Sequence, residues 1–126
     1  MTPTQTDEVD LREFDTGDRV RVVLASGEEF SLYVSRYGGN PATDYSRGHR
    51  SLTVEGEGVW EQVKDRVESE VLHLRQQYEQ RTADPRTAKL YGTVWKRDDG
   101  APKEAAEPYY EALGEVETVE QRGGDE

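Results

Sequence analysis

The sequence predicts an α+β fold in which a small antiparallel sheet packs on one long amphipathic helix. One observation is the stretch Gly58–Arg81, where apolar residues recur at helical spacing. The other is a set of shorter segments on both sides of it, in which apolar and polar residues alternate as in half-buried strands. Together they give the order β-β-β-α-β, and a helix laid on one face of the sheet buries both apolar surfaces at once.

The first two predicted strands form a hairpin around the turn Ser26–Gly27. Two alternating runs separated by a short glycine-containing turn are typical of antiparallel hairpins. The inward sets are Val20, Val22 and Leu24 in the first strand, and Phe30, Leu32 and Val34 in the second.

A loop is expected over Arg36–Arg50, followed by a third strand over Ser51–Glu55. The loop contains Gly38–Gly39 and Asn40–Pro41, and it is longer than most connections in compact domains. Such loops are often functional.

The predicted helix has one apolar stripe. On a helical projection its larger apolar residues fall within roughly 120°, the width expected of a helix packed on a core. They are Val59, Trp60, Val63, Val67, Val71, Leu74 and Tyr78. Glu57 and Glu61 lie near the positive end of the helix dipole, and Asp84–Pro85 closes the segment.

A fourth strand is expected over Ala88–Lys96, with its inward face left open between Leu90 with Val94 and Tyr91 with Trp95. A short helix over Lys103–Leu113 follows. The predicted organisation is a flexible N-terminus over residues 1–10, a single α+β domain over 11–113, and an acidic disordered tail over 114–126.

The composition is strongly acidic. Net charge is −11, from 27 acidic against 16 basic residues, and 12 of the basic residues are Arg. Dense carboxylates with little Lys are typical of proteins that work in molar KCl, where salt screens their repulsion. An acidic protein from a low-salt cell with a disordered acidic tail is the alternative. Without cysteine, a signal peptide or a long apolar run, we expect a soluble cytoplasmic protein and no membrane contact.

The motifs that would indicate an enzyme are missing. Gly56-Glu57-Gly58 has Glu61 where a dinucleotide fingerprint needs glycine, and Glu57 would repel a phosphate. His49 and His73 are the only histidines and lack metal-ligand spacing. We therefore predict no catalytic residue, no metal and no cofactor, and a small enzyme with carboxylate chemistry is the least favoured class.

Two binding surfaces are candidates. The first is the most basic and aromatic segment, which has the residue types that bind phosphates and stack on bases. Its residues are Arg36, Tyr37, Tyr45, Arg47, His49 and Arg50. These arginines could instead pair with carboxylates of the chain itself. The second surface, for a protein partner, comprises Tyr109, Tyr110 and Leu113. We predict a non-enzymatic binding module with an unknown protein partner, with nucleic acid as the alternative ligand and a homodimer left open.

Gly17–Phe30, with the sequence GDRVRVVLASGEEF, resembles the opening hairpin of small SH3-like and Sm-like barrels. In those folds a Gly-Asp turn leads a strand into a Ser-Gly hairpin. The long helix predicted before the last strand departs from them, so their RNA-binding residues are not carried over. In composition the chain resembles small acidic proteins of haloarchaea, a likeness that implies no activity.

The halophilic interpretation predicts how stability depends on salt. Because salt screens repulsion between exposed carboxylates, the midpoint of unfolding should rise steadily from dilute buffer toward molar KCl. Circular dichroism at increasing KCl measures it. A flat or falling midpoint would contradict the interpretation.

Overall fold

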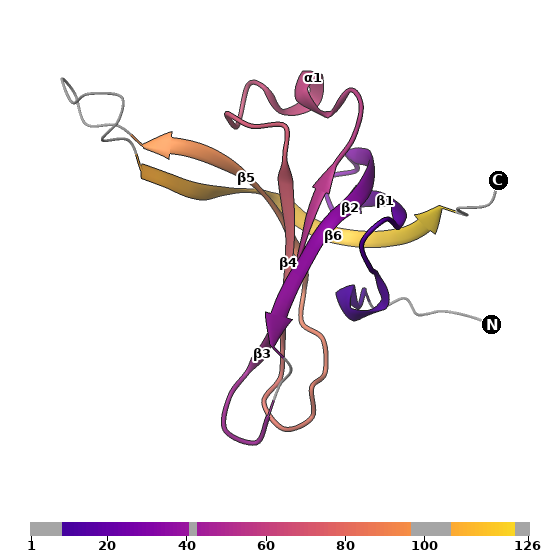
Figure 1. Cartoon of the computed structure of the whole chain (residues 1–126), viewed down its shortest axis with the longest axis vertical. Helices are drawn as coiled ribbons and strands as arrows, with labels where there is room; N and C mark the ends of the chain where they lie inside the picture. Colours follow the sequence, from indigo (N-terminus) through magenta and orange to yellow (C-terminus); the bar gives the residue numbers. More distant parts are fainter. Residues whose placement is uncertain (1–8, 41–42, 97–106, 123–126) are drawn as a thin grey trace.

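The computed structural model describes residues 9–40, 43–96 and 107–122, and within them six strands close into an antiparallel barrel (Figure 1). Each strand pairs with its sequence neighbours, and the last strand returns to pair with the first. The strands are β1 (Arg19–Leu24), β2 (Glu29–Asn40), β3 (Gly48–Glu55), β4 (Leu72–Tyr78), β5 (Lys89–Lys96) and β6 (Glu107–Arg122). The helices described are the 3₁₀ turn η1 (Leu11–Glu13) and α1 (Val59–Val63).

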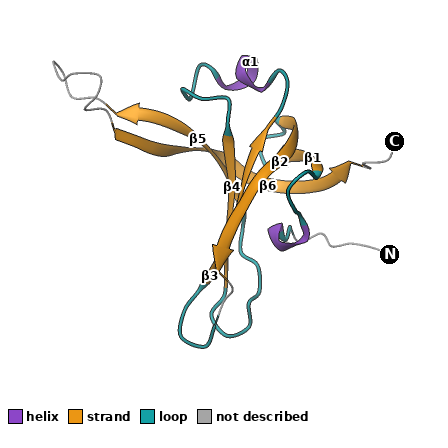
Figure 2. Ribbon diagram, viewed as in Figure 1, coloured by secondary structure: helices purple, strands orange, loops and turns teal. Residues whose placement is uncertain are grey.

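The predicted α+β class is therefore wrong. The stretch Gly58–Arg81 is not one helix, since only Val59–Val63 is helical and Leu72–Tyr78 is strand β4 (Figure 2). Along β4, buried and more exposed residues alternate strictly, as a strand between core and solvent requires. Among the described residues no helix is long and apolar enough to cross a membrane.

Other predicted elements are confirmed. The hairpin about Ser26–Gly27 pairs β1 with β2, with Val22 opposite Phe30. The third strand and the strand over Ala88–Lys96 correspond to β3 and β5. Leu90 is the inward residue of β5, which answers the question that its sequence left open.

Two segments differ from expectation because strands continue into them. The predicted Arg36–Arg50 loop is mostly paired backbone, since β2 extends to Asn40 and β3 begins at Gly48. Strand β6 occupies Glu107–Arg122, where the end of a helix and an acidic tail were expected. The remainder of that helix and tail, residues 103–106 and 123–126, and residues 1–8 of the N-terminus lie outside the described residues.

The core lies inside the barrel and is covered at both ends. Alternate residues of the strands point inward. Val59 and Val63 of α1 cover one end, and Leu11 with Phe14 around η1 covers the other. These side chains are fully or almost fully buried. Removing their apolar area from water supplies the main favourable term of folding.

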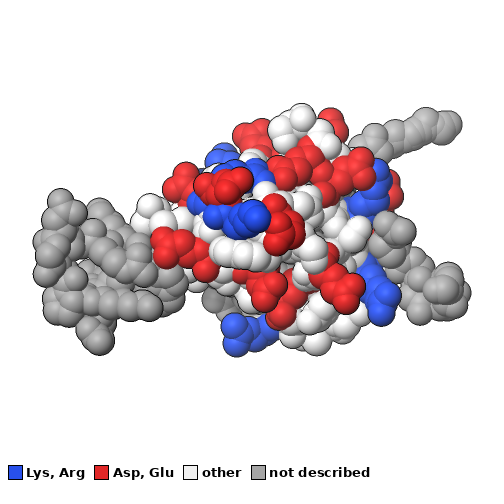
Figure 3. Space-filling view, turned by 90° about the horizontal axis from the view of Figure 1, so that it is seen from above, with Lys and Arg blue, Asp and Glu red and all other residues white. Residues whose placement is uncertain are grey.

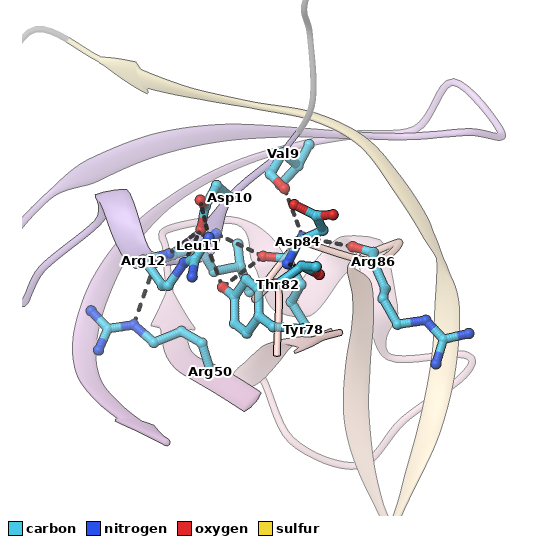
Figure 4. Close-up of polar contacts among 10 residues, drawn as sticks. Val9, Asp10, Leu11, Arg12, Arg50, Tyr78, Thr82, Asp84 and Arg86 are labelled. Atoms are coloured by element: carbon cyan, nitrogen blue, oxygen red, sulfur yellow. Dashed lines mark hydrogen bonds and ion pairs between the residues drawn. The ribbon is translucent and has the colours of Figure 1, made fainter. Parts of the chain in front are cut away.

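Among the residues that the structure describes, Gln76 is the one polar or charged residue in the buried set, at 2% exposure, and all of its hydrogen-bonding capacity is used. Its Nε2 donates to Val9 O at 2.6 Å and to Arg86 O at 2.7 Å. Its Oε1 accepts from Leu11 N and from the Tyr78 hydroxyl, both at 2.8 Å. Figure 4 shows Val9, Leu11, Tyr78 and Arg86 gathered around one point, with dashed lines for these hydrogen bonds. One amide thus ties the N-terminal segment and the start of β5 to β4.

The Gln76 amide predicts a specific stability defect. Gln76→Leu should lower the free energy of unfolding by about 3 kcal/mol, because it leaves buried donors and acceptors without partners. Chemical denaturation measures the change. Gln77→Leu is the matched control, since Gln77 is the next residue of the same strand and its side chain is exposed. The free energy of unfolding of this variant should stay within about 0.5 kcal/mol of wild type. Equal effects of the two substitutions would contradict the role assigned to Gln76.

Candidate functional site

The outer surface of β2–β5 is built from side chains in register. One row crosses the barrel through Arg36, Thr53, His73 and Tyr91, each paired with the next across adjacent strands. Neighbouring strands lie about 4.8 Å apart. A cation, a hydroxyl and two aromatic rings are therefore brought side by side from four strands.

A second row lies two residues further along each strand, or about 7 Å away. It runs through Gly38, Ser51, Arg75, Lys89 and Glu115. The small residues at its β2 and β3 positions keep that part of the surface low. The cations of this row come from β4 and β5, next to the aromatic residues of the first row.

Tyr110 of β6 leans onto this surface. Its ring lies 5.0 Å from the His73 ring in an edge-on arrangement, and the Arg75 guanidinium carbon lies 5.5 Å from its centroid. Contacts of this kind are favourable. Tyr110 nevertheless keeps 51% of its surface exposed. The ring is thus held at a defined position and remains open to a ligand.

The cations of this surface lack carboxylate partners. Among the described residues, Arg36, Arg75 and Lys89 form no ion pair, whereas cations elsewhere mostly do. We use the name basic face for the outward cations and aromatic rings on β2–β6 and the residue before β3; the carboxylate of Glu115, opposite Lys89, lies beside them. Its members are Arg36, Arg47, His49, His73, Arg75, Lys89, Tyr91 and Tyr110.

The α1 end of the molecule has the opposite character. Figure 3 shows carboxylates and cations intermingled there. Arg66 is bound by both carboxylate oxygens of Glu28, at 2.9 and 2.7 Å, and Lys64 pairs with Glu61 at 2.8 Å. These cations are neutralised within the chain. The basic face differs from this end because it groups Arg36, Arg75 and Lys89, which form no ion pair among the described residues.

His73 reports on the field of the basic face. Its half-burial lowers its pKa from the ordinary value of 6.5, and the charges of Arg75 and Arg36 lower it further. At neutral pH His73 is consequently an uncharged ring that packs against Tyr110.

The structure divides the six residues predicted in the segment 36–50. Arg36 and His49 lie on the basic face, and Arg47 lies at its edge, with Nη1 3.5 Å from Gln77 Oε1. Tyr45 projects from the connection before β3 with 92% of its surface exposed.

Tyr37 and Arg50 form a structural pair instead. The Arg50 guanidinium lies 4.1 Å from the Tyr37 ring centroid and donates to the carbonyls of Phe14 at 2.7 Å and Leu11 at 3.4 Å. It also lies 3.7 Å from Asp15. Arg50 thus holds η1 on the end of the barrel. For this residue the alternative stated from the sequence applies, in which an arginine of the segment 36–50 binds groups of the chain itself.

A β-bulge explains this division. The β2–β3 register shifts between Val34 and Arg36, so that Arg36 pairs with outward Thr53 and Tyr37 with inward Leu52. Without the extra residue, strict alternation would place Arg36 inward and Tyr37 outward. The bulge therefore delivers Arg36 to the basic face.

The predicted protein-binding residues also separate. Tyr110 belongs to the basic face, whereas Tyr109 lies at the adjacent position of β6 and so on the opposite side of that strand. Leu113 is partly buried and packs against the core. These residues do not form one surface.

Sequence reasoning missed His73, Arg75, Lys89 and Tyr91 as members of a site. The signal was present for β4, because Leu72, Leu74 and Gln76 alternate with His73, Arg75 and Gln77. A helical interpretation of the same residues placed the polar ones on separate parts of a helix surface. Within the described part of the chain, no group of three or more potential metal ligands occurs.

The lowered pKa of His73 predicts a pH-dependent loss of stability. The unfolded chain takes up this proton first, so the contribution of neutral His73 is present above pH 6.5 and is lost as the pH falls through the folded-state pKa. Wild type should lose stability relative to His73→Gln as the pH falls below about 7.5. Denaturant unfolding of both proteins measures the difference, and parallel profiles would contradict the prediction.

Comparisons with protein-family models, with curated proteins and with solved structures found no match. The resemblance of Gly17–Phe30 to the opening hairpin of SH3-like and Sm-like barrels therefore stays a prediction. The function of the chain has to follow from the chemistry of the basic face.

Proposed function

We propose that this protein is a non-enzymatic binding module that holds single-stranded nucleic acid on its basic face. The observation that carries the proposal is the set of cations that form no ion pair among the described residues, interleaved with partly exposed rings on adjacent strands. Surfaces that bind single strands combine these two features, because cations follow the phosphates while aromatic rings stack on the bases.

The rings favour an unpaired strand over a duplex. Tyr110 is half exposed, and Tyr91 lies two residues from Thr93, the β5 partner of Tyr110. Bases reach such rings only when they are unstacked from a complementary strand. Stacking on an aromatic side chain contributes about 1–3 kcal/mol per base.

A protein partner is the competing class. An acidic peptide would satisfy the same cations, but it offers nothing specific to the two tyrosines and His73. The residues first predicted for a protein partner do not lie together, since Leu113 packs on the core. The basic face therefore supports nucleic acid more strongly.

The net charge of −11 opposes nucleic acid in dilute buffer. The repulsion between the carboxylates of the chain and a polyanion acts at long range, and salt screens it beyond about 8–10 Å at physiological ionic strength. Direct contacts on the basic face are screened less. The ligand should consequently bind best at intermediate salt. At molar salt counterion release contributes little, and stacking would supply most of the affinity.

The test uses a fluorescent single-stranded oligomer of about ten nucleotides, titrated with the full chain and followed by anisotropy. Replacing Arg36 and Arg75 together by Ala should weaken binding at least about tenfold. Because each lost phosphate contact removes about 0.7 from the salt slope for single strands, the slope should fall by roughly 1.4.

Lys64→Ala is the matched control, since Lys64 is an exposed cation at the α1 end. It should leave the affinity unchanged, and circular dichroism should show every variant folded. Failure of the wild-type chain to bind any single-stranded oligomer would refute the proposal. So would an equal loss in Lys64→Ala.

A further inference from the structure

The basic face contains a hollow where β4 and β5 separate. The two strands pair through Arg75 and Lys89, and they next meet where Arg86 N donates to Gln77 O at 2.9 Å. One residue of β4, Gln76, therefore faces two residues of the other chain segment, which is the arrangement of a β-bulge. On the outside this leaves an open hollow of about 700 Å³.

Five cations line the hollow. They are Arg47 before β3, Arg50 of β3, Arg75 of β4, Arg86 beside the bulge and Lys89 of β5. Of the described residues that line it, Glu115 alone carries a carboxylate. Arg50 pairs with Asp15 at 3.7 Å and Arg86 with Glu79 at 3.2 Å, and the other three cations form no ion pair among the described residues.

We propose that this hollow receives the terminal phosphate of the bound strand, an inference that rests on the proposed function. A phosphate monoester carries a charge of about −1.5 to −2 at neutral pH and three free oxygens, whereas an internal phosphodiester carries one negative charge. Converging arginines suit the monoester, because each guanidinium donates two parallel hydrogen bonds to phosphate oxygens.

The surroundings of the hollow favour a strand end over a continuing backbone. On one side, Lys89 leads along β5 to Tyr91 and then toward Tyr110, so the first bases meet the rings. On the other side lies the connection between β4 and β5, where Glu79 N donates to Asp84 O at 2.8 Å. A strand that continued past the hollow would bring its next phosphates against the carboxylates of Glu79 and Asp84.

The experiment compares one oligomer sequence with a 5′-phosphate, with a 3′-phosphate and with hydroxyl groups at both ends. For the full wild-type chain, one terminal phosphate should tighten binding by about tenfold over the hydroxyl form. The preferred end identifies the polarity of the strand. The measured quantity is the affinity for the preferred phosphorylated oligomer divided by the affinity for the hydroxyl form. A variant that weakens binding of both oligomers equally leaves this ratio unchanged.

Substitutions that keep side-chain size locate the phosphate. Lys89→Gln and Arg86→Gln should each bring the ratio toward one, and Glu115→Gln should raise it by removing the carboxylate that lines the hollow. Arg36→Gln is the matched control, because Arg36 lies on the basic face outside the hollow. It should weaken both oligomers and preserve the ratio.

The outcomes separate the two proposals. Equal binding of all three oligomers overturns the terminal-phosphate inference and leaves the proposed function standing. A phosphate preference that survives both Lys89→Gln and Arg86→Gln in folded protein also overturns it. Absence of binding by every oligomer refutes both.

Discussion

Closure of the barrel depends on the buried amide of Gln76. Its side chain replaces the backbone pairing that β4 and β5 lose at the bulge, by donating to Arg86 O. The same amide receives Leu11 N and donates to Val9 O, so the segment that covers this end of the core is fixed by the same group. A buried amide with every donor and acceptor used stabilises one arrangement of its neighbours, because any other leaves polar groups unpaired.

This constraint also shapes the outer surface. The bulge that Gln76 bridges from inside opens the hollow outside, and it sets Arg86 and Lys89 on either side of it. Bulges commonly re-aim side chains near functional sites. A second bulge on β2 turns Arg36 outward in the same way. The β5–β6 register also shifts between Leu90 and Tyr91, before the pair of Thr93 with Tyr110. The basic face is thus assembled by three departures from regular pairing, while the regular parts of the sheet supply its rigidity.

Strands β1 and β2 could be predicted from the sequence because their residues alternate and a short turn joins them. Strands β3 and β5 were also predicted. Strand β4 was predicted as part of a helix because Val71, Leu74 and Tyr78 fit helical spacing. The strand signal was the shorter alternation of Leu72, Leu74 and Gln76 with polar residues. Arg36 and His49 were predicted as site residues, but so was Arg50, whose role depends on η1 from a distant segment. Bulge positions and long-range packing decide such cases, and neither leaves a local pattern.

The contrast between the acidic chain and its basic face has a physical consequence for selectivity. Carboxylates paired with cations at the α1 end, such as Glu28 with Arg66, leave little positive charge there. The net charge of −11 repels polyanions at long range, and the cations of the basic face offset that repulsion locally. Repulsion of this kind limits non-specific association, which otherwise dominates binding to nucleic acid. In concentrated salt the long-range part is screened, and under the proposed function ring stacking and direct guanidinium–phosphate bonds would then determine which ligand stays bound.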